Sequence, residues 1–341
     1  MTRQGKLQTK TKAVFVRTRR PVRALARLAG TEAAWVRSRR AGADVAVFHE
    51  LLPPPSGGGH QFIRALSGEL ARRGLTVELN RISGRTPACL FNSFNFDFHR
   101  LRRFARHGCR MAHRVDGPIG VYRGFDDGTD RRILEINHEL AEVTVFQSRF
   151  SLEKHRELGL ELRNPVVIPN AVDPRIFFPP EARESLGGRR LRVIATSWSD
   201  NPNKGAGIFT WLDRNLDWSR YELTFVGRSG VPFDRIRTVG PVGSDVVADL
   251  LRRHDLYVAA SRDDPCSNAL LEALACGLPA AYLDSGGHPE LVGDAGLAFA
   301  SADELPAVLE RLAEEVDERR RAIRLPSISE VADRFLALLE P

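Results

Sequence analysis

Two carboxylates and a lysine stand out because their spacing fits the binding of a charged, hydroxyl-rich ligand. Asp264 lies in a polar loop, and Glu272 follows on a predicted helix. Carboxylates at such places can accept hydrogen bonds from sugar and ribose hydroxyls. Lys204 precedes a glycine and a predicted helix, where an ammonium group is a good point charge for phosphate. Taken alone, these residues also fit solvated side chains on an ordinary strand-loop-helix unit.

The elements around these residues predict how they are positioned. A short apolar run, Leu256–Ala260, is typical of a buried parallel strand. A helix is expected from its polar N-cap candidate Ser267 to its C-terminal stop at Gly277. Backbone N–H groups at such a helix start lack helical partners and carry partial positive charge, which suits phosphate or a sugar hydroxyl. Ser267, Asn268 and Ala269 are therefore candidate binding residues.

The stretch that contains the two acids resembles the signature of retaining glycosyltransferases of family 4, which have the GT-B fold. The family pattern is Glu, seven residues, Glu, Ala, an apolar residue, Ala, a variable residue, Gly and Pro. Asp264 and Glu272 stand at the two acids, and the pattern continues in register to Pro279. The family's Gly-Gly-x-Pro-Glu fits residues 286–290. Two departures lie at the sugar-facing end: the first acid is Asp, and Cys-Ser replaces the usual Phe-Gly.

This resemblance implies roles for the candidate residues. Lys204 and the start of the helix would bind the donor diphosphate, Asp264 would hold sugar hydroxyls, and Glu272 would bind the ribose. The family usually has an arginine after the strand that precedes the lysine, and that arginine is absent here. Arg228, which follows another predicted strand, is the candidate that supplies the missing charge.

The first half of the chain contains a glycine-rich turn after its first predicted strand, Asp44–Leu52. Gly58 and Gly59 in this turn let the backbone approach a ligand closely. A helix, Gln61–Arg73, is expected to follow. The turn is not GxGxxG, so the dinucleotide fingerprint fails. It resembles the first glycine loop of GT-B transferases, which faces the cleft, and a flexible surface loop is the alternative.

Another predicted strand, Met111–Val115, carries three polar residues at its end: His113, Arg114 and Asp116. Ligands of open α/β sheets bind outside the carboxyl ends of strands, which makes these residues cleft candidates and His113 a catalytic candidate. The alternative is an Arg-Asp pair that closes a turn, with His113 partly buried. A helix is expected over Phe125–Leu140.

Length and the alternation of strands and helices predict two domains. A chain of 341 residues with 43% hydrophobic residues can bury two cores. We expect an α/β protein of the GT-B class, with two Rossmann-like domains facing an interdomain cleft. The expected parts are a basic arm over residues 1–43, an acceptor domain over 44–175, a donor domain over 176–325, and a C-terminal helix over 326–341 that packs back on the first domain.

The cysteines and the net charge indicate the redox compartment and the kinds of binding partner. The four cysteines form no CxxC pair, which favours a reduced, cytoplasmic setting. No apolar stretch reaches the roughly 18 residues of a membrane span, and no signal-peptide core follows the basic start. A formal charge of +7 favours anionic partners. Nucleic acid is not expected, because aromatic residues do not interleave with the basic ones.

The resemblance implies a hexosyltransferase-like enzyme that moves a sugar from a nucleoside diphosphate-sugar to an acceptor hydroxyl with retention of configuration. The acceptor is an unknown glycan or lipid-linked molecule. No cofactor or metal is expected, since the sequence shows no metal-binding cluster and the nucleotide-sugar is a substrate. One alternative is a non-catalytic nucleotide-sugar-binding protein of the same fold, which the absent arginine and the Asp at position 264 favour. The other is a related GT-B activity, such as a sugar-nucleotide epimerase, or a phosphorylase, whose pyridoxal-binding lysine the sequence does not place.

The basic segment over residues 1–43 has only one acid, Glu32. Residues 18–28 fit a short amphipathic helix that contacts anionic lipid headgroups at the inner face of a membrane. A disordered or loosely docked arm is the alternative. We predict that deleting residues 1–40 lowers co-sedimentation with anionic liposomes, with neutral liposomes as the control. Equal sedimentation of both proteins would remove the membrane role.

Overall fold

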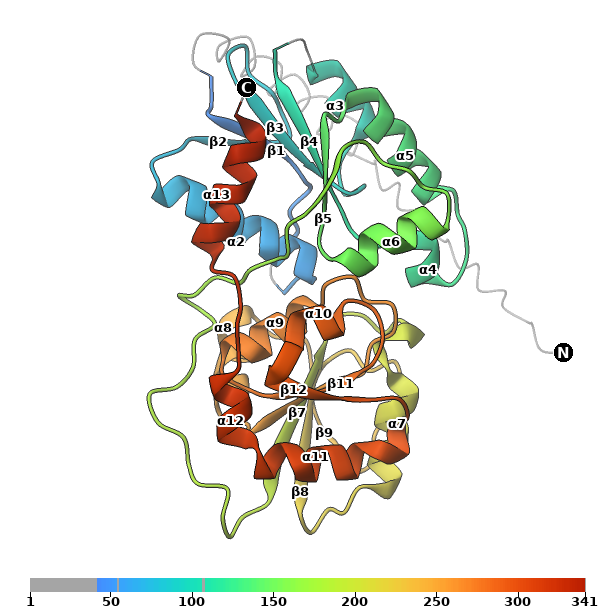
Figure 1. The fold of residues 1–341 in the computed structure, drawn as a ribbon, viewed down its shortest axis with the longest axis vertical. Coiled ribbons are helices and arrows are strands. Elements are labelled where there is room, and N and C mark those ends of the chain that lie inside the picture. Colours follow the sequence, from blue (N-terminus) through green and yellow to red (C-terminus); the bar gives the residue numbers. More distant parts are fainter. Residues whose placement is uncertain (1–41, 54, 106–107, 341) are drawn as a thin grey trace, which may run out of the picture. The chain divides into compact units, whose positions relative to one another are not determined.

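The computed structural model describes residues 42–53, 55–105 and 108–340 of the chain (Figure 1). Most of the basic segment predicted at 1–43 lies outside these residues. One compact unit, Ala43–Ile82 with Thr86–Pro341, contains two β-sheets, and everything below concerns this unit.

The first sheet has six parallel strands in the order β2-β1-β3-β4-β5-β6. The strands are β1 (Val45–Phe48), β2 (Val77–Leu79), β3 (Ala88–Asn92), β4 (Arg110–Val115), β5 (Val143–Phe146) and β6 (Pro165–Val167). Every residue of β1, β3 and β5 is buried, as expected for parallel strands covered on both faces. The strand order reverses between β1 and β3.

The second sheet also has six parallel strands, in the order β12-β11-β10-β7-β8-β9. The strands are β7 (Leu191–Ser197), β8 (Tyr221–Gly227), β9 (Arg237–Val239), β10 (Leu256–Ala259), β11 (Ala280–Leu283) and β12 (Gly296–Phe299). The order reverses between β7 and β10, and ligands of open α/β sheets bind outside the carboxyl ends of strands at such a switch point. The predicted α/β fold with two Rossmann-like halves is confirmed.

Helices connect the strands of both sheets. Those that follow the strands of the first sheet are α2 (Gly58–Arg72), α3 (Phe98–Phe104), α4 (Ile119–Arg123), α5 (Thr129–Leu140) and α6 (Arg149–Glu157). Those of the second are α7 (Ala206–Asn215), α8 (Ser244–Arg252), α9 (Asn268–Ala275), α10 (His288–Val292), α11 (Leu305–Glu314) and α12 (Val316–Arg321). Short 3-10 turns are η1 (Pro202–Lys204), η2 (Gly293–Ala295) and η3 (Ala302–Glu304), and the chain ends with α13 (Ile328–Leu339).

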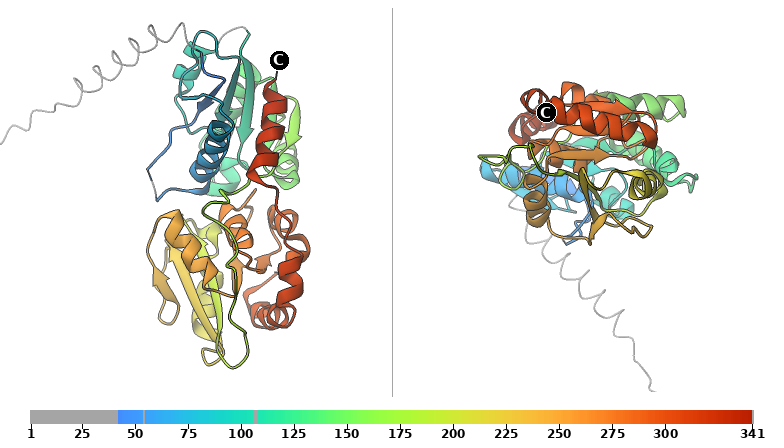
Figure 2. Two further views of the ribbon diagram at one scale, coloured as in Figure 1. Left: turned by 90° about the vertical axis from the view of Figure 1, so that its left-hand side faces the viewer. Right: turned by 90° about the horizontal axis from the view of Figure 1, so that it is seen from below.

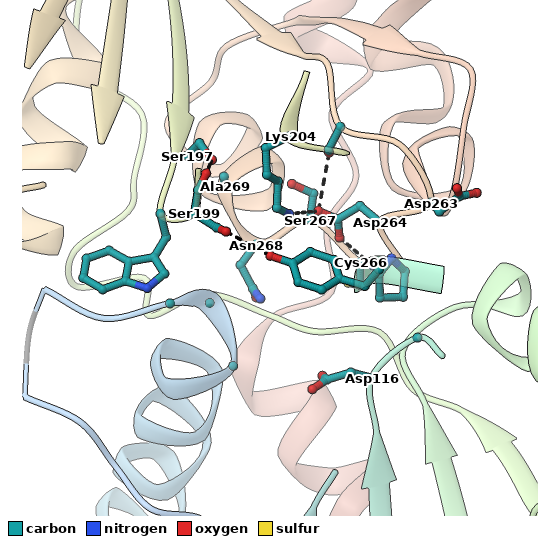
Figure 3. Close-up of a pocket in the computed structure, with 18 of the residues that line it drawn as sticks. Asp116, Ser197, Ser199, Lys204, Asp263, Asp264, Cys266, Ser267, Asn268 and Ala269 are labelled. Carbon is teal, nitrogen blue, oxygen red and sulfur yellow. Dashed lines mark hydrogen bonds and ion pairs between the residues drawn. The ribbon is translucent and has the colours of Figure 1, made fainter. Parts of the chain in front are cut away.

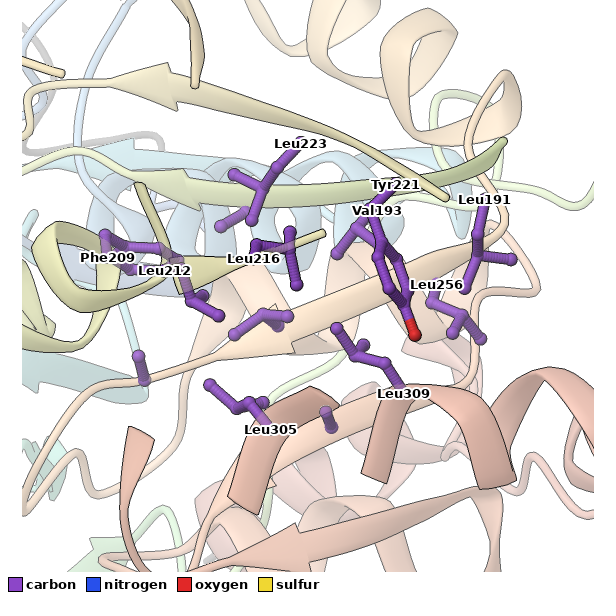
Figure 4. Close-up of a cluster of buried hydrophobic side chains, with 14 of the residues drawn as sticks. Leu191, Val193, Phe209, Leu212, Leu216, Tyr221, Leu223, Leu256, Leu305 and Leu309 are labelled. Carbon is purple, nitrogen blue, oxygen red and sulfur yellow. The ribbon is translucent and has the colours of Figure 1, made fainter. Parts of the chain in front are cut away.

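Each sheet has an apolar core on both faces. Alternate residues of a strand point to opposite faces, so Val45 and Val47 of β1 join one cluster while Ala46 and Phe48 join another. In the second sheet, β7 and β8 pack against α7 and α11 (Figure 4). Leu305 and Leu309 of α11 are fully buried there. The cores hold the strand ends in place, and the strand ends carry the polar loops.

The C-terminal helix α13 packs against α2 of the first half, as the views in Figures 1 and 2 agree. The rings of Phe335 and Phe62 lie 6.0 Å apart within the first core. Arg73 pairs with Asp333 at the surface. A capping box at Ser327 starts the helix. The described part of the chain from β1 to α13 thus begins and ends on the same half, although the domain boundaries themselves remain a prediction.

Polar contacts also join the two halves. Glu290 of α10 accepts hydrogen bonds from the backbone N–H groups of Arg149 (2.8 Å) and Phe150 (2.7 Å) at the start of α6. The hydroxyl of Tyr122 in α4 lies 3.1 Å from that of Ser199, which follows β7. These contacts hold the loops of the second sheet against helices of the first half.

The helix predicted over Phe125–Leu140 was wrong at its start, because two glycines interrupt the segment. Gly124 and Gly128 both have φ of 78°, a left-handed conformation that ends α4 and precedes α5. The side chain of Asp126 accepts a hydrogen bond from the Gly128 N–H at 2.8 Å, and that of Asp127 accepts one from the Thr129 N–H at 3.1 Å. The sequence prediction therefore missed α4, which lines the site described below.

We predict that Phe335→Ala lowers the free energy of unfolding by about 3–5 kcal/mol, because it removes a buried aromatic ring from the contact between α13 and α2. Urea unfolding followed by circular dichroism measures this. Ala337→Ser on the exposed side of the same helix is the matched control and should unfold like the wild type. Equal stability of the Phe335 variant would mean that α13 does not anchor the first half.

Candidate functional site

A cavity of about 330 Å³ lies where strand ends from both sheets meet. From the first half it is lined by the glycine turn, by the loop after β4 and by α4. From the second half it is lined by the loops after β7 and β10 and by the start of α9. Eight of the twelve predicted site residues line it: Gly58, Gly59, Asp116, Lys204, Asp264, Ser267, Asn268 and Ala269. Figure 3 shows the labelled members of this group around one space.

An ion pair between Lys204 and Asp264 occupies the centre of the second-half wall (Figure 3). The ammonium Nζ of Lys204 lies 2.7 Å from Oδ2 of Asp264. Burial alone would lower the pKa of Lys204, but the attraction to Asp264 outweighs it and the pKa is raised. Burial would raise the pKa of Asp264, and the nearby Lys204 with its hydrogen bond brings it below the ordinary value. Both groups are therefore charged at neutral pH.

Glycines on two loops make this ion pair possible. Gly205 has φ of 84°, and a Cβ there would come within 2.6 Å of the Ala260 carbonyl oxygen, so only glycine lets the chain after Lys204 lie against the end of β10. Gly286 has φ of 66°, and a Cβ there would lie 2.7 Å from the backbone nitrogen of Asp264. The N–H of Gly287 donates to the carbonyl of Asp264 at 2.9 Å. The loop after β11 thus supports the loop that carries the carboxylate.

The start of α9 faces the cavity and the glycine turn. Ser267 is the N-cap and accepts a hydrogen bond from the Leu270 N–H at 3.4 Å. The side chain of Asn268 packs where a Cβ of Gly58 would lie, so only a glycine permits this approach of α2 to α9. A Cβ added at Gly59 would meet no atom within 4 Å, and Gly59 lines the cavity. The predicted cleft-facing roles of the glycine turn and of the helix start fit this geometry.

His113 and Arg114 lie in the interior and do not line the cavity. His113 is fully buried, stacks on Phe91 with ring centroids 4.2 Å apart, and lies 3.0 Å from the Ser93 carbonyl. Burial lowers the pKa of His113 to about 4, so the ring is neutral. Strand β4 is central in its sheet, and helices cover both of its faces. The positions therefore offer no direct ligand contact, against the catalytic prediction for His113 and the binding prediction for Arg114.

Arg114 instead organises a buried polar network. Its guanidinium donates to the side-chain oxygens of Asn92 at 2.5 Å and Asn170 at 2.8 Å, and it lies over the ring of Phe62. It also reaches Asp116 at 3.3 Å. Asp116 is 29% exposed at its side chain, lines the cavity and accepts a hydrogen bond from Gln147 as well. This arrangement matches the alternative expectation of an Arg-Asp pair that closes a turn.

Glu272 and Arg228 stand outside the cavity lining. Glu272 is partly buried on α9, and burial raises the pKa of its carboxyl to about 8. The Arg228 guanidinium lies 4.8 Å from the ring centroid of Trp198, and Trp198 does line the cavity. Arg228 thus contacts a residue of the cavity lining but does not line the cavity itself.

Sequence reasoning missed Trp198, Tyr122 and Arg123 of the lining. Trp198 follows β7, in the loop where family 4 members usually carry an arginine. Its position in that loop was the signal that could have identified it as a lining residue. Tyr122 and Arg123 belong to the missed helix α4. The Lys204 ammonium lies 5.5 Å from the Tyr122 ring centroid, so this helix adds an aromatic face beside the cation.

The described part of the chain has neither a metal-binding cluster nor a membrane-spanning helix. There, no group of three or more His, Cys, Asp or Glu side chains is arranged to hold a metal ion. The four cysteines are free and buried. Across the same residues, every helix is too short or too polar to cross a bilayer.

The comparisons with known proteins agree with this geometry. The family described as "Glycosyl transferases group 1" matches residues 218–315. The phosphatidylinositol N-acetylglucosaminyltransferase GPI3 subunit of Saccharomyces cerevisiae (strain YJM789) is 27% identical over 151 residues, which cover 39% of this chain and 33% of that protein. The chain thus spans about a third of the length of the curated relatives it matches.

Two solved structures show the same fold. Sucrose-phosphate synthase from Thermosynechococcus elongatus has a TM-score of 0.64 and 16% identity, covering 87% of this chain and 94% of that one. Anabaena HepE in complex with UDP-glucose has a TM-score of 0.60 and 16% identity, covering 86% and 95%. The predicted GT-B fold is confirmed, and within it residues 218–315 are similar to the glycosyl transferases group 1 family.

We predict that Glu272→Gln stabilises the protein by up to about 4 kcal/mol at pH 8 and has little effect near pH 4. The pKa is 4.5 in the reference state and about 8 in the fold, so between these values the folded protein holds a proton that the unfolded chain releases. Stability of the wild type therefore falls as pH rises through this window, and glutamine removes that loss. Urea unfolding across the pH range checks this, with Glu153→Gln on exposed surface as control. Parallel curves for all three proteins would contradict the burial of this carboxyl.

Proposed function

We propose that this chain is a retaining glycosyltransferase that moves a sugar from a nucleoside diphosphate-sugar to an acceptor hydroxyl. The observation that carries the proposal is the Lys204–Asp264 ion pair beside the start of α9, at the switch point between β7 and β10. A cation and a helix start suit the diphosphate of such a donor, and the carboxylate suits its sugar hydroxyls. The matched group 1 domain supports the same assignment. Retention of configuration follows from the resemblance to family 4.

The leaving group in this reaction is a diphosphate, so catalysis depends mainly on stabilising its negative charge. An ammonium group has three N–H donors, and Asp264 accepts one from Lys204 at 2.7 Å. The remaining donors of Lys204 can bind phosphate oxygens without breaking the ion pair. N–H groups in the first turn of α9 supply further donors next to the same space.

A second positive charge comes from Arg228 in this proposal. Its guanidinium is held over Trp198, which lines the cavity. Rotation of the long Arg228 side chain off the ring would bring the charge to a bound diphosphate. The aromatic ring would then be free to contact the ligand. Arg228 in this way replaces the arginine that family 4 members usually carry after the preceding strand.

The carboxyl groups of Asp264 and Glu272 are proposed to bind hydroxyl groups of different parts of the donor. Asp264 is ionised and accepts hydrogen bonds from the transferred sugar. Glu272 lies on α9 outside the cavity lining, and its proposed role at the ribose rests on the resemblance to family 4; burial raises the pKa of its carboxyl to about 8. Gly58, Gly59 and Asp116 lie on the first-half wall, where the acceptor would enter.

The acceptor is proposed to be a glycan or lipid-linked molecule, and the pathway glycan or glycolipid synthesis. The name of the GPI3 relative, a phosphatidylinositol N-acetylglucosaminyltransferase subunit, supports a lipid-linked acceptor. The basic residues 1–43 would serve an anionic membrane surface on the cytoplasmic side. No metal or other cofactor is expected to take part.

We predict that one member of a nucleotide-sugar panel is slowly hydrolysed by the purified protein, and that Lys204→Met lowers this rate about 10²–10³-fold by removing charge stabilisation from the leaving group. Release of the nucleoside diphosphate measures the rate. Lys154→Met, which loses a lysine paired with Glu157 away from the cavity, is the matched control. Unfolding curves show whether the Lys204 variant still folds with Asp264 unpaired.

The outcomes separate the alternatives. A donor that binds but is never hydrolysed or transferred would favour a non-catalytic binding protein. A product sugar with an inverted ring carbon would favour a sugar-nucleotide epimerase. If no nucleotide-sugar binds at all, the glycosyltransferase proposal fails.

A further inference from the structure

A buried histidine contacts the cavity wall through a serine. Ser261 follows β10, lines the cavity and is 7% exposed. His288 is the first residue of α10, is fully buried and does not line the cavity. Its Nε2 lies 3.0 Å from the Ser261 hydroxyl oxygen, and its Nδ1 lies 3.0 Å from the Leu283 carbonyl oxygen.

These two contacts determine which nitrogen of the ring carries the proton. A backbone carbonyl can only accept a hydrogen bond, so Nδ1 of His288 must be the donor to Leu283. Burial lowers the pKa of His288, against the opposing attraction of Asp264, while the positive charge of Lys204 acts in the same direction as burial. The ring is therefore neutral at pH 7, and its Nε2 is an acceptor.

The Ser261 hydroxyl has one hydrogen and two acceptors within reach. His288 Nε2 lies at 3.0 Å, and Asp264 Oδ2 lies at 3.4 Å. The shorter contact takes the hydrogen, because hydrogen bonds weaken with distance and Oδ2 already accepts from Lys204. The lone pairs of Ser261 and Asp264 then remain available on the cavity side.

We propose that His288 is a positioning residue that makes this end of the cavity accept hydrogen bonds and thereby selects the sugar part of the donor. It holds the hydrogen of Ser261 away from the cavity, so Ser261 and Asp264 together present oxygen acceptors to ligand hydroxyls. Without His288, the Ser261 hydroxyl turns to Asp264 and occupies an acceptor that a sugar hydroxyl needs. This inference rests on the proposed function, since it assumes that the sugar lies at Asp264.

The test compares ligands that differ only in the sugar. Calorimetry at pH 7.5 measures the affinity of the protein for each of four nucleotide-sugars: UDP-glucose, UDP-N-acetylglucosamine, GDP-mannose and ADP-glucose. The affinity for the matching nucleoside diphosphate, UDP, GDP or ADP, is measured in the same way. For the nucleotide-sugar that the wild type binds best, His288→Leu should weaken affinity about three- to tenfold, the range expected for one hydrogen bond. Affinity for the matching nucleoside diphosphate should stay unchanged.

Two further variants distinguish positioning from simple packing. His288→Gln places an amide oxygen near the position of Nε2 and should restore most of the affinity for the nucleotide-sugar. Ser261→Ala removes the hydroxyl, so adding His288→Leu to it should cause no further loss. A merely structural role would reduce affinity for both ligands and would persist in the Ser261→Ala background.

Each outcome has one meaning. Equal loss of nucleotide-sugar and nucleoside diphosphate affinity, or an undiminished His288→Leu effect without Ser261, overturns the inference and leaves the proposed function in place. If the wild type binds none of the four nucleotide-sugars, the proposed function fails and the inference falls with it.

Discussion

The ion pair between Lys204 and Asp264 is the interaction on which the rest of the site depends. Moving an ammonium and a carboxylate out of water is unfavourable, and their mutual attraction rarely does more than offset that loss. Such a pair is therefore better explained by what it positions than by stability. It requires β7 and β10 to be neighbours, which the reversal of strand order provides. It also requires Gly205, because any side chain there would overlap the end of β10.

A second set of contacts sets the distance between the two halves. Arg114 donates to Asn170, and the amide of Asn170 in turn donates to Asn268 at the start of α9. In the other direction the guanidinium reaches Asn92, whose amide lies 3.1 Å from His49. One buried charge thus connects the first sheet to the helix start that is proposed to bind phosphate. A residue expected to touch the ligand instead supports those that line the cavity.

The sequence predicted the cavity better than it predicted the interior. The strands followed from short apolar runs, and the Asp264, Lys204 and glycine positions followed from strand-loop-helix order and family resemblance. Residue order cannot show which strand lies centrally, so nothing distinguished Arg114, under helices, from Asp116, two positions later at the cavity. Contacts between the halves, such as Trp198 beside the glycine turn, depend on packing that no local pattern encodes.

The carboxylate of Glu290 links the two halves. It belongs to the second half by its covalent chain, yet it caps the first turn of α6 in the first half. Any motion that widens the gap between the halves would leave two amide hydrogens of α6 without their partner. Glu290 therefore caps the first turn of α6 only while the two halves are in contact.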